Sequence, residues 1–178
     1  INLNSLYGAI LNPGCRFFDK RIGQSTTLTG RTIVKHMSAE VNKIITGEYD
    51  HVGKAVIYGD TDSVYFSAYP VLKDEIAAGK IPWTKDNVIT LYDQVCEQAN
   101  TTFPEMMLKA FHCPKSRSDV IAAGREIVAE TGLFITKKRY AALVYDIEGF
   151  RTDEHGKLGK VKAMGLDLKR SDTPVFMQ

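Results

Sequence analysis

Apolar residues near the start of the chain recur three and four positions apart, which is the spacing of an amphipathic helix. Residues 1–11 follow this pattern and meet a helix-breaking Asn-Pro-Gly at residues 12–14. Residues 25–46 follow it again, with Ser or Thr at the N-cap and Gly47 directly after the last turn. Between these two predicted helices, residues 15–18 favour a short strand or an extended link.

The rest of the chain contains one more helical region and several β-favouring segments. A third helix begins with Thr84 as its N-cap and either continues or restarts at Pro104. Tyr69-Pro70 and a polar stretch lead to Ile81-Pro82-Trp83, and residues 112–119 are typical of a surface loop. The β-favouring segments are residues 120–129, 132–136, 140–147 and 158–164, with a polar loop over residues 148–156.

A further pair of strands is predicted around the sequence Tyr-Gly-Asp-Thr-Asp-Ser at residues 58–63. Apolar runs at residues 54–57 and 64–66 flank it, which indicates a hairpin with Asp60 and Asp62 at its tip. Side chains two positions apart in an extended segment point to the same side, although a tight turn can rotate one of them away. Together with the later strands, the hairpin predicts an α+β fold with a mostly antiparallel sheet packed on two long helices.

The two carboxylates at the tip suggest a metal site. Neighbouring carboxylates repel each other, and a divalent cation keeps both ionised. Carboxylate oxygens are hard ligands that favour Mg²⁺ or Mn²⁺ over zinc or copper, so this pair indicates phosphate chemistry. The competing interpretation is that Asp and Gly serve only as turn residues. An EF-hand calcium loop is excluded, because Val64 and Tyr65 occupy positions that need an oxygen ligand and Gly.

The composition is that of an ordinary globular chain of one domain, with 178 residues, 44% of them hydrophobic and 25% charged. The sequence begins at Ile1 inside an apolar stretch, so we expect a piece of a longer protein. It has no apolar run of membrane-spanning length and no signal-peptide pattern. Three cysteines without Cys-x-x-Cys spacing indicate reduced thiols in an intracellular protein, and the four histidines lack a zinc-binding spacing.

Charge is distributed unevenly, although the net charge is only +2. Residues 125–170 contain ten Lys or Arg against seven acids, whereas residues 51–124 contain seven against nine. Within the basic part, the Lys-Lys-Arg-Tyr sequence at residues 137–140 is predicted to occupy consecutive strand positions, with alternate members on opposite faces. Such a strand can contact a phosphate backbone, and the alternative is a solvated edge.

Three stretches resemble motifs of family B DNA polymerases, in the order that the family has. Asn-Ser-Leu-Tyr-Gly at residues 4–8 resembles the motif of the fingers helix, residues 58–63 resemble the carboxylate motif of the palm domain, and residues 137–140 resemble the motif that holds the primer duplex. The sequence as a whole resembles the tailed-phage replicative branch of this family more than the cellular branch. The resemblance implies that residues 1–12 are the C-terminal end of the fingers helix. It implies that residues 13–178 are part of the palm, with the thumb beginning near residue 174.

The resemblance also implies roles for individual residues. Asp62 would be the direct metal ligand, Asp60 a less direct catalytic and metal-binding partner, and Glu126 an accessory carboxylate. The residues that would line the pocket of the nascent base pair are Asn4, Tyr7 and Gly8. The residues that would contact DNA are Tyr58, Thr61, Lys137, Lys138, Arg139 and Tyr140. The sequence contains no Asp-x-x-Ser-Leu-Tyr-Pro motif, which in the family supplies the other metal-binding Asp, and the position of the fingers Lys falls before Ile1.

The activity implied by this resemblance is template-directed addition of deoxynucleotides to a primer 3′ end by two-metal phosphoryl transfer. The implied cofactor is Mg²⁺, with two ions in the complete enzyme and Mn²⁺ as a substitute. The implied partners are primer-template DNA and deoxynucleoside triphosphates, without a membrane, in the cytoplasm or in a host cytoplasm if the source is viral. We expect the isolated chain to be inactive and to expose a sheet edge through which it can dimerise.

Two other function classes explain part of the sequence. A glycosyltransferase that holds Mn²⁺ with Asp-x-Asp accounts for Asp60 and Asp62 but leaves residues 4–8 and 137–140 without a role. A non-catalytic nucleic-acid-binding domain accounts for the basic residues and makes the acidic hairpin a simple turn. If an Asp62→Asn variant loses primer extension but still binds DNA, neither the glycosyltransferase nor the non-catalytic binding domain explains the result.

Overall fold

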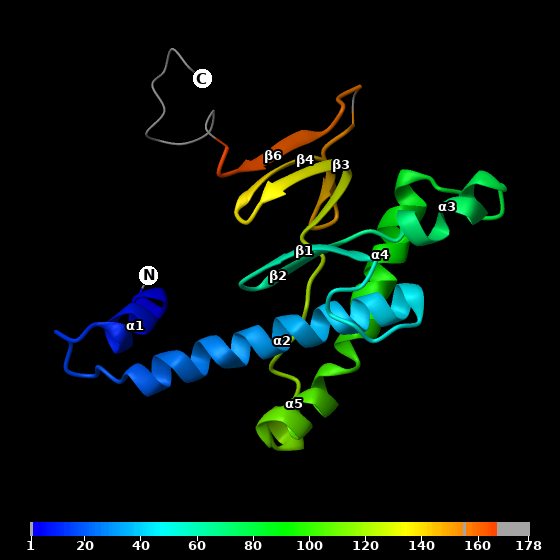
Figure 1. Cartoon of the computed structure of the whole chain (residues 1–178). Helices are drawn as coiled ribbons and strands as arrows, with labels where there is room; N and C mark the ends of the chain where they lie inside the picture. Colours follow the sequence, from blue (N-terminus) through cyan, green and yellow to red (C-terminus); the bar gives the residue numbers. More distant parts are fainter. Residues whose placement is uncertain (1, 155, 167–178) are drawn as a thin grey trace, which may run out of the picture.

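The computed structural model describes residues 2–154 and 156–166, with side chains from Ser5 onward. The side chain of Asn4 and the predicted start of a thumb near residue 174 lie outside the described residues. The helices are α1 (Asn2–Leu11), α2 (Lys20–Thr46), α3 (Tyr69–Ala77), α4 (Lys85–Asn100) and α5 (Phe103–Phe111), with a 3-10 turn at Lys115–Arg117 (Figure 1). The strands are β1 (Val56–Asp60), β2 (Ser63–Phe66), β3 (Ile127–Thr136), β4 (Arg139–Ile147), β5 (Phe150–Arg151) and β6 (Lys160–Met164).

The longest element is α2, which runs alongside the β1–β2 hairpin (Figure 1). It begins at Lys20 and not at residue 25 as predicted. The reason is that Asp19 has extended dihedral angles and its carboxylate accepts a hydrogen bond from the Arg21 N–H at 2.9 Å, which makes Asp19 the N-cap. The helix ends as predicted, because Gly47 adopts the left-handed conformation with φ 84°.

The link between α1 and α2 is a tight reversal, and the predicted short strand or extended link at residues 15–18 is wrong. Its backbone N–H groups at Cys15 and Phe18 donate to carbonyls three positions earlier, at 2.9 and 3.1 Å. The reversal brings α1 back against α2, where a Cβ on Gly23 would lie 2.1 Å from Cδ2 of Leu11. A side chain at position 23 would therefore force the Leu11 side chain to move.

The next three helices begin at recognisable signals. Thr84 caps α4 as predicted, with its hydroxyl accepting a hydrogen bond from the Asn87 N–H at 3.3 Å, and α5 restarts with Pro104 in its first turn. The sequence analysis missed α3, which begins at Tyr69 with Pro70 in its first turn, where proline is well tolerated. Among the helices that the structure describes, none has the length and apolar character needed to cross a membrane.

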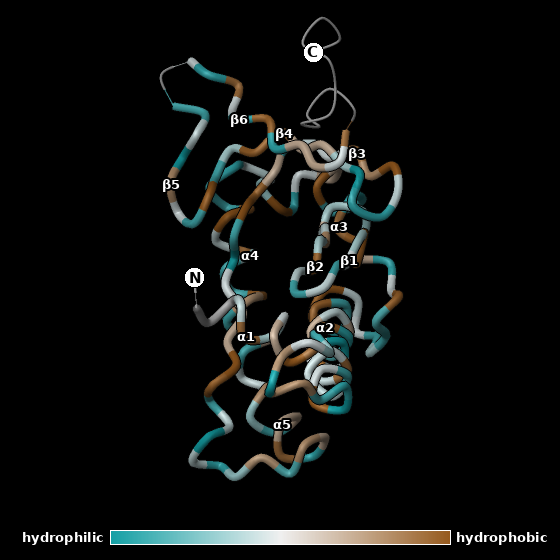
Figure 2. Tube along the Cα trace, turned by 90° about the vertical axis from the view of Figure 1, so that its left-hand side faces the viewer, coloured by the Kyte–Doolittle hydropathy of each residue, from teal (hydrophilic) through white to brown (hydrophobic). Residues whose placement is uncertain are grey.

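The strands form two antiparallel sheets, which confirms the predicted α+β class. One sheet is the β1–β2 hairpin; in the other, β4 pairs with β3, β5 and β6. Figure 2 shows the hairpin and α2 on one side of the molecule and β5 and α4 on the other, with β3 and β4 at the top. The two segments predicted at residues 120–129 and 132–136 are one strand, β3, which continues through Gly132, while residues 120–126 have no strand.

The larger sheet is attached to α4 by a small core and by ionic contacts. Val88 of α4, Val128 of β3 and Tyr145 of β4 are buried together. Above the Tyr145 ring, at 5.1 Å, lies Nζ of Lys85, and the Arg151 guanidinium lies 5.6 Å from the same ring. Cations over an aromatic face in a partly desolvated site stabilise it by about 0.5–2 kcal/mol.

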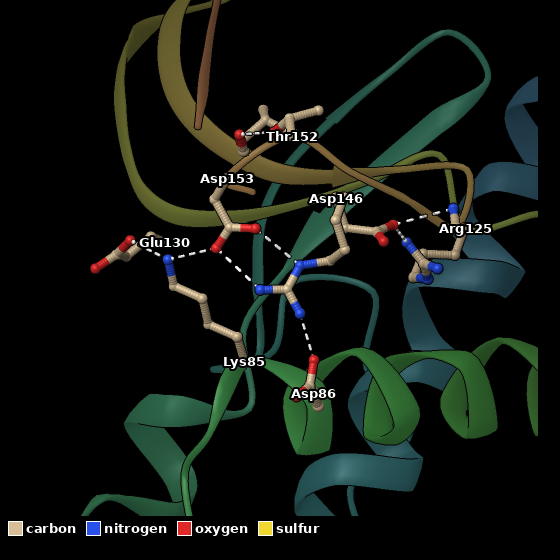
Figure 3. A network of polar contacts seen from close by, with 10 residues as sticks. Lys85, Asp86, Arg125, Glu130, Asp146, Thr152 and Asp153 are labelled. Atoms are coloured by element: carbon tan, nitrogen blue, oxygen red, sulfur yellow. Dashed lines mark hydrogen bonds and ion pairs between the residues drawn. The ribbon is translucent and has the colours of Figure 1, made fainter. Parts of the chain in front are cut away.

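Carboxylates complete this attachment, which we call the ionic clasp (Figure 3). Asp153 accepts hydrogen bonds from Lys85 at 2.9 Å and from Arg151 at 2.8 and 2.9 Å. Arg151 also pairs with Asp86 of α4. Arg125, which precedes β3, makes a second set of ion pairs. Its guanidinium pairs with Asp93, farther along α4, and with Asp146 of β4, which is only 1% exposed. The ionic clasp therefore joins α4 to both ends of the β4–β5 turn.

Candidate active site

The tip of the β1–β2 hairpin is a two-residue turn formed by Thr61 and Asp62, because Asp60 and Ser63 are the last paired residues. Thr61 adopts φ 42°, which is unusual for a β-branched residue and indicates local strain. Hydrogen bonds hold this conformation: the Thr61 hydroxyl donates to the Asp60 carboxylate at 3.2 Å, and the Ser63 hydroxyl donates to the Asp60 carbonyl at 3.3 Å. The predicted hairpin and its acidic tip are therefore confirmed.

The two carboxylates of the tip have different surroundings. The Asp60 side chain is 17% exposed, and one of its oxygens lies 3.9 Å from Nζ of Lys137. Asp62 is exposed and lines a cavity between the hairpin and β3. The turn thus directs Asp62 to the cavity and leaves Asp60 beside a cation. This arrangement agrees with a more direct role for Asp62, which stays a prediction.

Glu126, the predicted accessory carboxylate, precedes β3 and lines the same cavity as Asp62. Its carboxylate pairs with Nζ of Lys162 on β6, and its backbone carbonyl accepts a hydrogen bond from the Glu148 N–H at 2.8 Å. Within residues 2–154 and 156–166, no three acidic, histidine or cysteine side chains gather closely enough to hold a metal ion. The hard carboxylate oxygens at the tip are of the kind that Mg²⁺ prefers.

The basic residues at 137–140 do not form consecutive strand positions, so this local prediction is wrong. Lys137 and Lys138 form the turn between β3 and β4, and Lys138 adopts φ 61°. The register explains the turn, because Thr136 pairs with Arg139 and leaves two residues to reverse the chain. Lys137 and Lys138 are exposed, and we call these two residues the basic turn.

The last two residues of this motif lie in β4 and are less accessible. Arg139 is half-buried, and Tyr140 is only 3% exposed, with its hydroxyl 2.8 Å from the Tyr65 hydroxyl. Burial, together with this hydrogen bond, raises the pKa of the Tyr65 hydroxyl. A DNA contact by Tyr140 would need its ring to leave the position that it has here, whereas the basic turn can meet a phosphate without rearrangement.

An aromatic cluster that the sequence analysis did not find connects the hairpin to the larger sheet. It consists of Tyr58 of β1, Tyr65 of β2, Phe134 of β3 and Tyr140 of β4, with ring centroids 5.3 to 6.0 Å apart. The Tyr58 hydroxyl also accepts a hydrogen bond from the Lys138 N–H at 2.8 Å. Aromatic residues on β-favouring segments were a visible signal, but only the packing shows that these four meet.

The residues of the predicted nucleotide pocket lie on α1, at the N-terminal end of α2 (Figure 1). The Tyr7 hydroxyl is 2.8 Å from the Thr27 hydroxyl, which itself donates to the Gly23 carbonyl at 2.9 Å. A side chain on Gly8 would meet no atom of another element within 4 Å. The surface beside α1 is therefore open at this glycine, and the role of Asn4, Tyr7 and Gly8 stays a prediction.

The cavity between the hairpin and β3 has a volume of about 560 Å³, and we call it the groove. Its walls include consecutive residues of the hairpin, 61–67, and of the segment that leads into β3, 121–132. Side chains alternate along a strand, so the uninterrupted lining along β2 (63–66) and the start of β3 (127–132) indicates that the backbone edges of these strands border the groove. Among the described strands, β2 pairs only with β1 and β3 only with β4. Two open strand edges therefore border one apolar space.

Comparison of the sequence with known proteins identifies the family of this chain. The sequence profile of DNA polymerase family B matches residues 1–110. The chain is 30% identical to the DNA-directed DNA polymerase of Escherichia phage RB69 over 99% of its length, and 26% identical to that of Enterobacteria phage T4 over all of it. It is also 28% identical to DNA polymerase II of Escherichia coli strain K12 over its whole length. The chain spans about 20% of the length of each of these relatives. It belongs to DNA polymerase family B.

Proposed function

We propose that the chain forms part of the palm of a DNA-directed DNA polymerase, preceded by the end of a fingers helix at residues 1–12. The complete protein would add deoxynucleotides to the 3′ end of a primer annealed to a template. The observation that supports this most strongly is the hairpin tip itself, where Asp62 faces the groove within a chain of this family. The relatives named above are DNA polymerases, which is consistent with the proposal.

The acidic tip would hold the cations of the reaction. We assign Asp62 as a direct ligand, Asp60 as a secondary partner and Glu126 as an accessory carboxylate on the groove wall. Bound Mg²⁺, or Mn²⁺ in its place, would supply charge neutralisation of the triphosphate and a lower pKa of the primer hydroxyl. The residues of this chain would fix the position of the reacting groups, which contributes several kcal/mol to such reactions.

The groove would be filled in the complete protein by an extended segment. Its two open edges can each pair with an added strand, and its walls are largely apolar, as a strand buried on both faces requires. A segment with the sequence Asp-x-x-Ser-Leu-Tyr-Pro would bring the missing carboxylate beside Asp62. This accounts for the incomplete ligand set among the described residues.

The basic turn would hold the primer strand next to the tip. Lys137 and Lys138 are exposed and can contact phosphates. We also assign DNA contacts to Thr61, in the hairpin turn, and to Arg139, which follows the basic turn in the chain. A Lys138→Ala variant should bind primer-template more weakly and with a shallower dependence of affinity on salt. The reason is that one phosphate contact fewer means that about one counterion fewer is released when DNA binds. The salt slope of the wild type and the variant can be compared by fluorescence anisotropy.

The proposed function is tested by Asp62→Asn in the complete protein. We expect primer extension with Mg²⁺ to fall by about a thousand-fold or more while primer-template binding changes little, because the carboxylate charge is lost at the reacting centre. Asp74→Asn is the matched control: Asp74 is exposed on α3, and this variant should extend primers at the wild-type rate. Near-normal extension by Asp62→Asn would refute the proposed function.

A further inference from the structure

The hydroxyl of Tyr58 contacts the basic turn through its backbone. Tyr58 lies on β1 two residues before Asp60, and its hydroxyl oxygen is 2.8 Å from the backbone nitrogen of Lys138, 80 residues later in the chain. A backbone N–H can only donate, so the Tyr58 oxygen is the acceptor. This bond joins the strand that carries the acidic tip to the turn that carries two exposed cations.

The peptide groups of Lys138 need such support. A residue other than Gly is strained at φ 61°, and such a conformation persists where the surroundings fix it. On the other side of the turn, the Lys138 carbonyl lies so close to Gly165 that a Cβ there would be 2.0 Å from the carbonyl oxygen. The Lys138 N–H is therefore bound by Tyr58, while its carbonyl lies in a space that is open only because residue 165 is a glycine.

The position of the turn matters because it lies next to the acidic tip. Nζ of Lys137 is 3.9 Å from the Asp60 carboxylate, so a shift of the turn changes the distance between its cations and the proposed metal ligands. Tyr58 itself is half-buried, and its ring packs against Tyr65, Phe134 and Tyr140 at 5.6 to 6.0 Å. The ring is fixed by these contacts, and its hydroxyl is engaged by the Lys138 N–H.

We propose that Tyr58 is a positioning residue for Lys138: its hydroxyl sets the conformation of the basic turn and so the place where the Lys138 ammonium group meets the primer phosphate. This inference rests on the proposed function, because it presupposes that Lys138 contacts DNA. It replaces the sequence-based assignment of Tyr58 as a direct DNA contact. Tyr58 acts on DNA through Lys138, and its hydroxyl makes no independent contribution to DNA affinity.

The test is a double-mutant cycle in the complete protein with Tyr58→Phe and Lys138→Met, read by the dissociation constant of a primer-template over a range of salt concentrations. The variant Tyr58→Phe keeps the ring and removes only the hydroxyl. We expect it to weaken binding about 3- to 10-fold, the effect of losing one hydrogen bond, and to lower the salt slope toward that of Lys138→Met. In the Lys138→Met background, Tyr58→Phe should change binding by less than about 2-fold.

Tyr65→Phe is the matched control, since it removes a hydroxyl from the same aromatic cluster without touching the Lys138 N–H. It should leave the salt slope at the wild-type value in both backgrounds. If Tyr58→Phe weakens binding equally with and without the Lys138 side chain, at an unchanged salt slope, the hydroxyl contacts DNA directly and the inference is wrong. The inference is also overturned if Tyr58→Phe binds primer-template with the affinity and the salt slope of the wild type. Failure of the wild type to extend primers would instead refute the proposed function.

Discussion

The two flanks of β3 and β4 differ in how they are closed. On the side of α4, the ionic clasp and the buried Tyr145 join sheet and helix with contacts made entirely within the described residues. On the side of the hairpin, the groove, which parts of α2 and α4 also line, leaves two strand edges facing a largely apolar space of about 560 Å³. The first flank is complete by itself. The second borders the candidate site with strand edges that have no partner among the described strands.

The largest expected effect concerns the open flank. We expect the isolated 178-residue chain to extend primers at least about a thousand-fold more slowly than the complete protein, because the groove would lack the strand that supplies the second carboxylate. The two proteins would be compared in a single-turnover extension assay with Mg²⁺. Extension by the isolated chain at a rate within ten-fold of the complete protein would show that the groove needs no added strand.

The open edges also make a prediction about association. We expect the isolated chain to dimerise as its concentration rises, since unpaired strand edges beside apolar surface recruit another chain. Sedimentation velocity would measure this. Thr131→Lys, on the groove wall of β3, should favour the monomer by placing a charge on the edge, whereas Thr90→Lys on the exposed face of α4 should not. Equal association of both variants would place the interface elsewhere.

The closed flank should be the more sensitive one in terms of stability. Arg125→Met, in the ionic clasp at the margin of the groove, leaves the buried carboxylate of Asp146 without its cationic partner, although the Gly149 N–H still donates to it. We expect the free energy of unfolding to fall by about 3–5 kcal/mol. Met37→Ala, on the half-buried groove wall, should cost only about 1 kcal/mol, since part of that side chain is already exposed. Urea denaturation measures both, and a larger loss for Met37→Ala would reverse the comparison.

The smallest effect is a pH dependence within the ionic clasp. Hydrogen bonds from Arg151 and Lys85 hold the pKa of the Asp153 carboxyl well below its usual range. Its contribution to stability is therefore complete above the unfolded pKa of about 3.9 and is lost as the pH falls through the lower pKa of the folded state. Asp153→Asn should reduce the urea midpoint at pH 7 and have a smaller effect at pH 2.5. Equal reductions at both pH values would contradict this.

Local signals in the sequence were sufficient for several elements. Thr84, Pro104 and Gly47 set helix ends through their own hydroxyl, ring or missing side chain, and the structure has those ends where they were predicted. Other signals were present but ambiguous. Pro70 is compatible with a turn and with the first turn of a helix, and the structure has helix α3 there, with none of its residues buried. The proline by itself does not distinguish these two conformations.

The candidate site likewise contains residues that the sequence identified and residues whose arrangement only the packing shows. Asp60 and Asp62 were recognisable because two acids between β-favouring runs have a clear chemical meaning, and the hairpin is formed by contacts within eleven residues. The conformation of Lys138, the burial of Tyr140 and the meeting of four aromatic rings depend on β3 and β4, more than 60 residues later. No spacing in the sequence specifies these long-range contacts.

The sequence by itself therefore determined the fold class, the acidic hairpin and the family, because each depends on short-range pattern or on motif identity. Only the tertiary structure decided which carboxylate faces the groove, how the basic turn is held against the tip, and which flank of the sheet is left open. These are consequences of packing between distant segments, where a single turn conformation directs a side chain toward one surface or another.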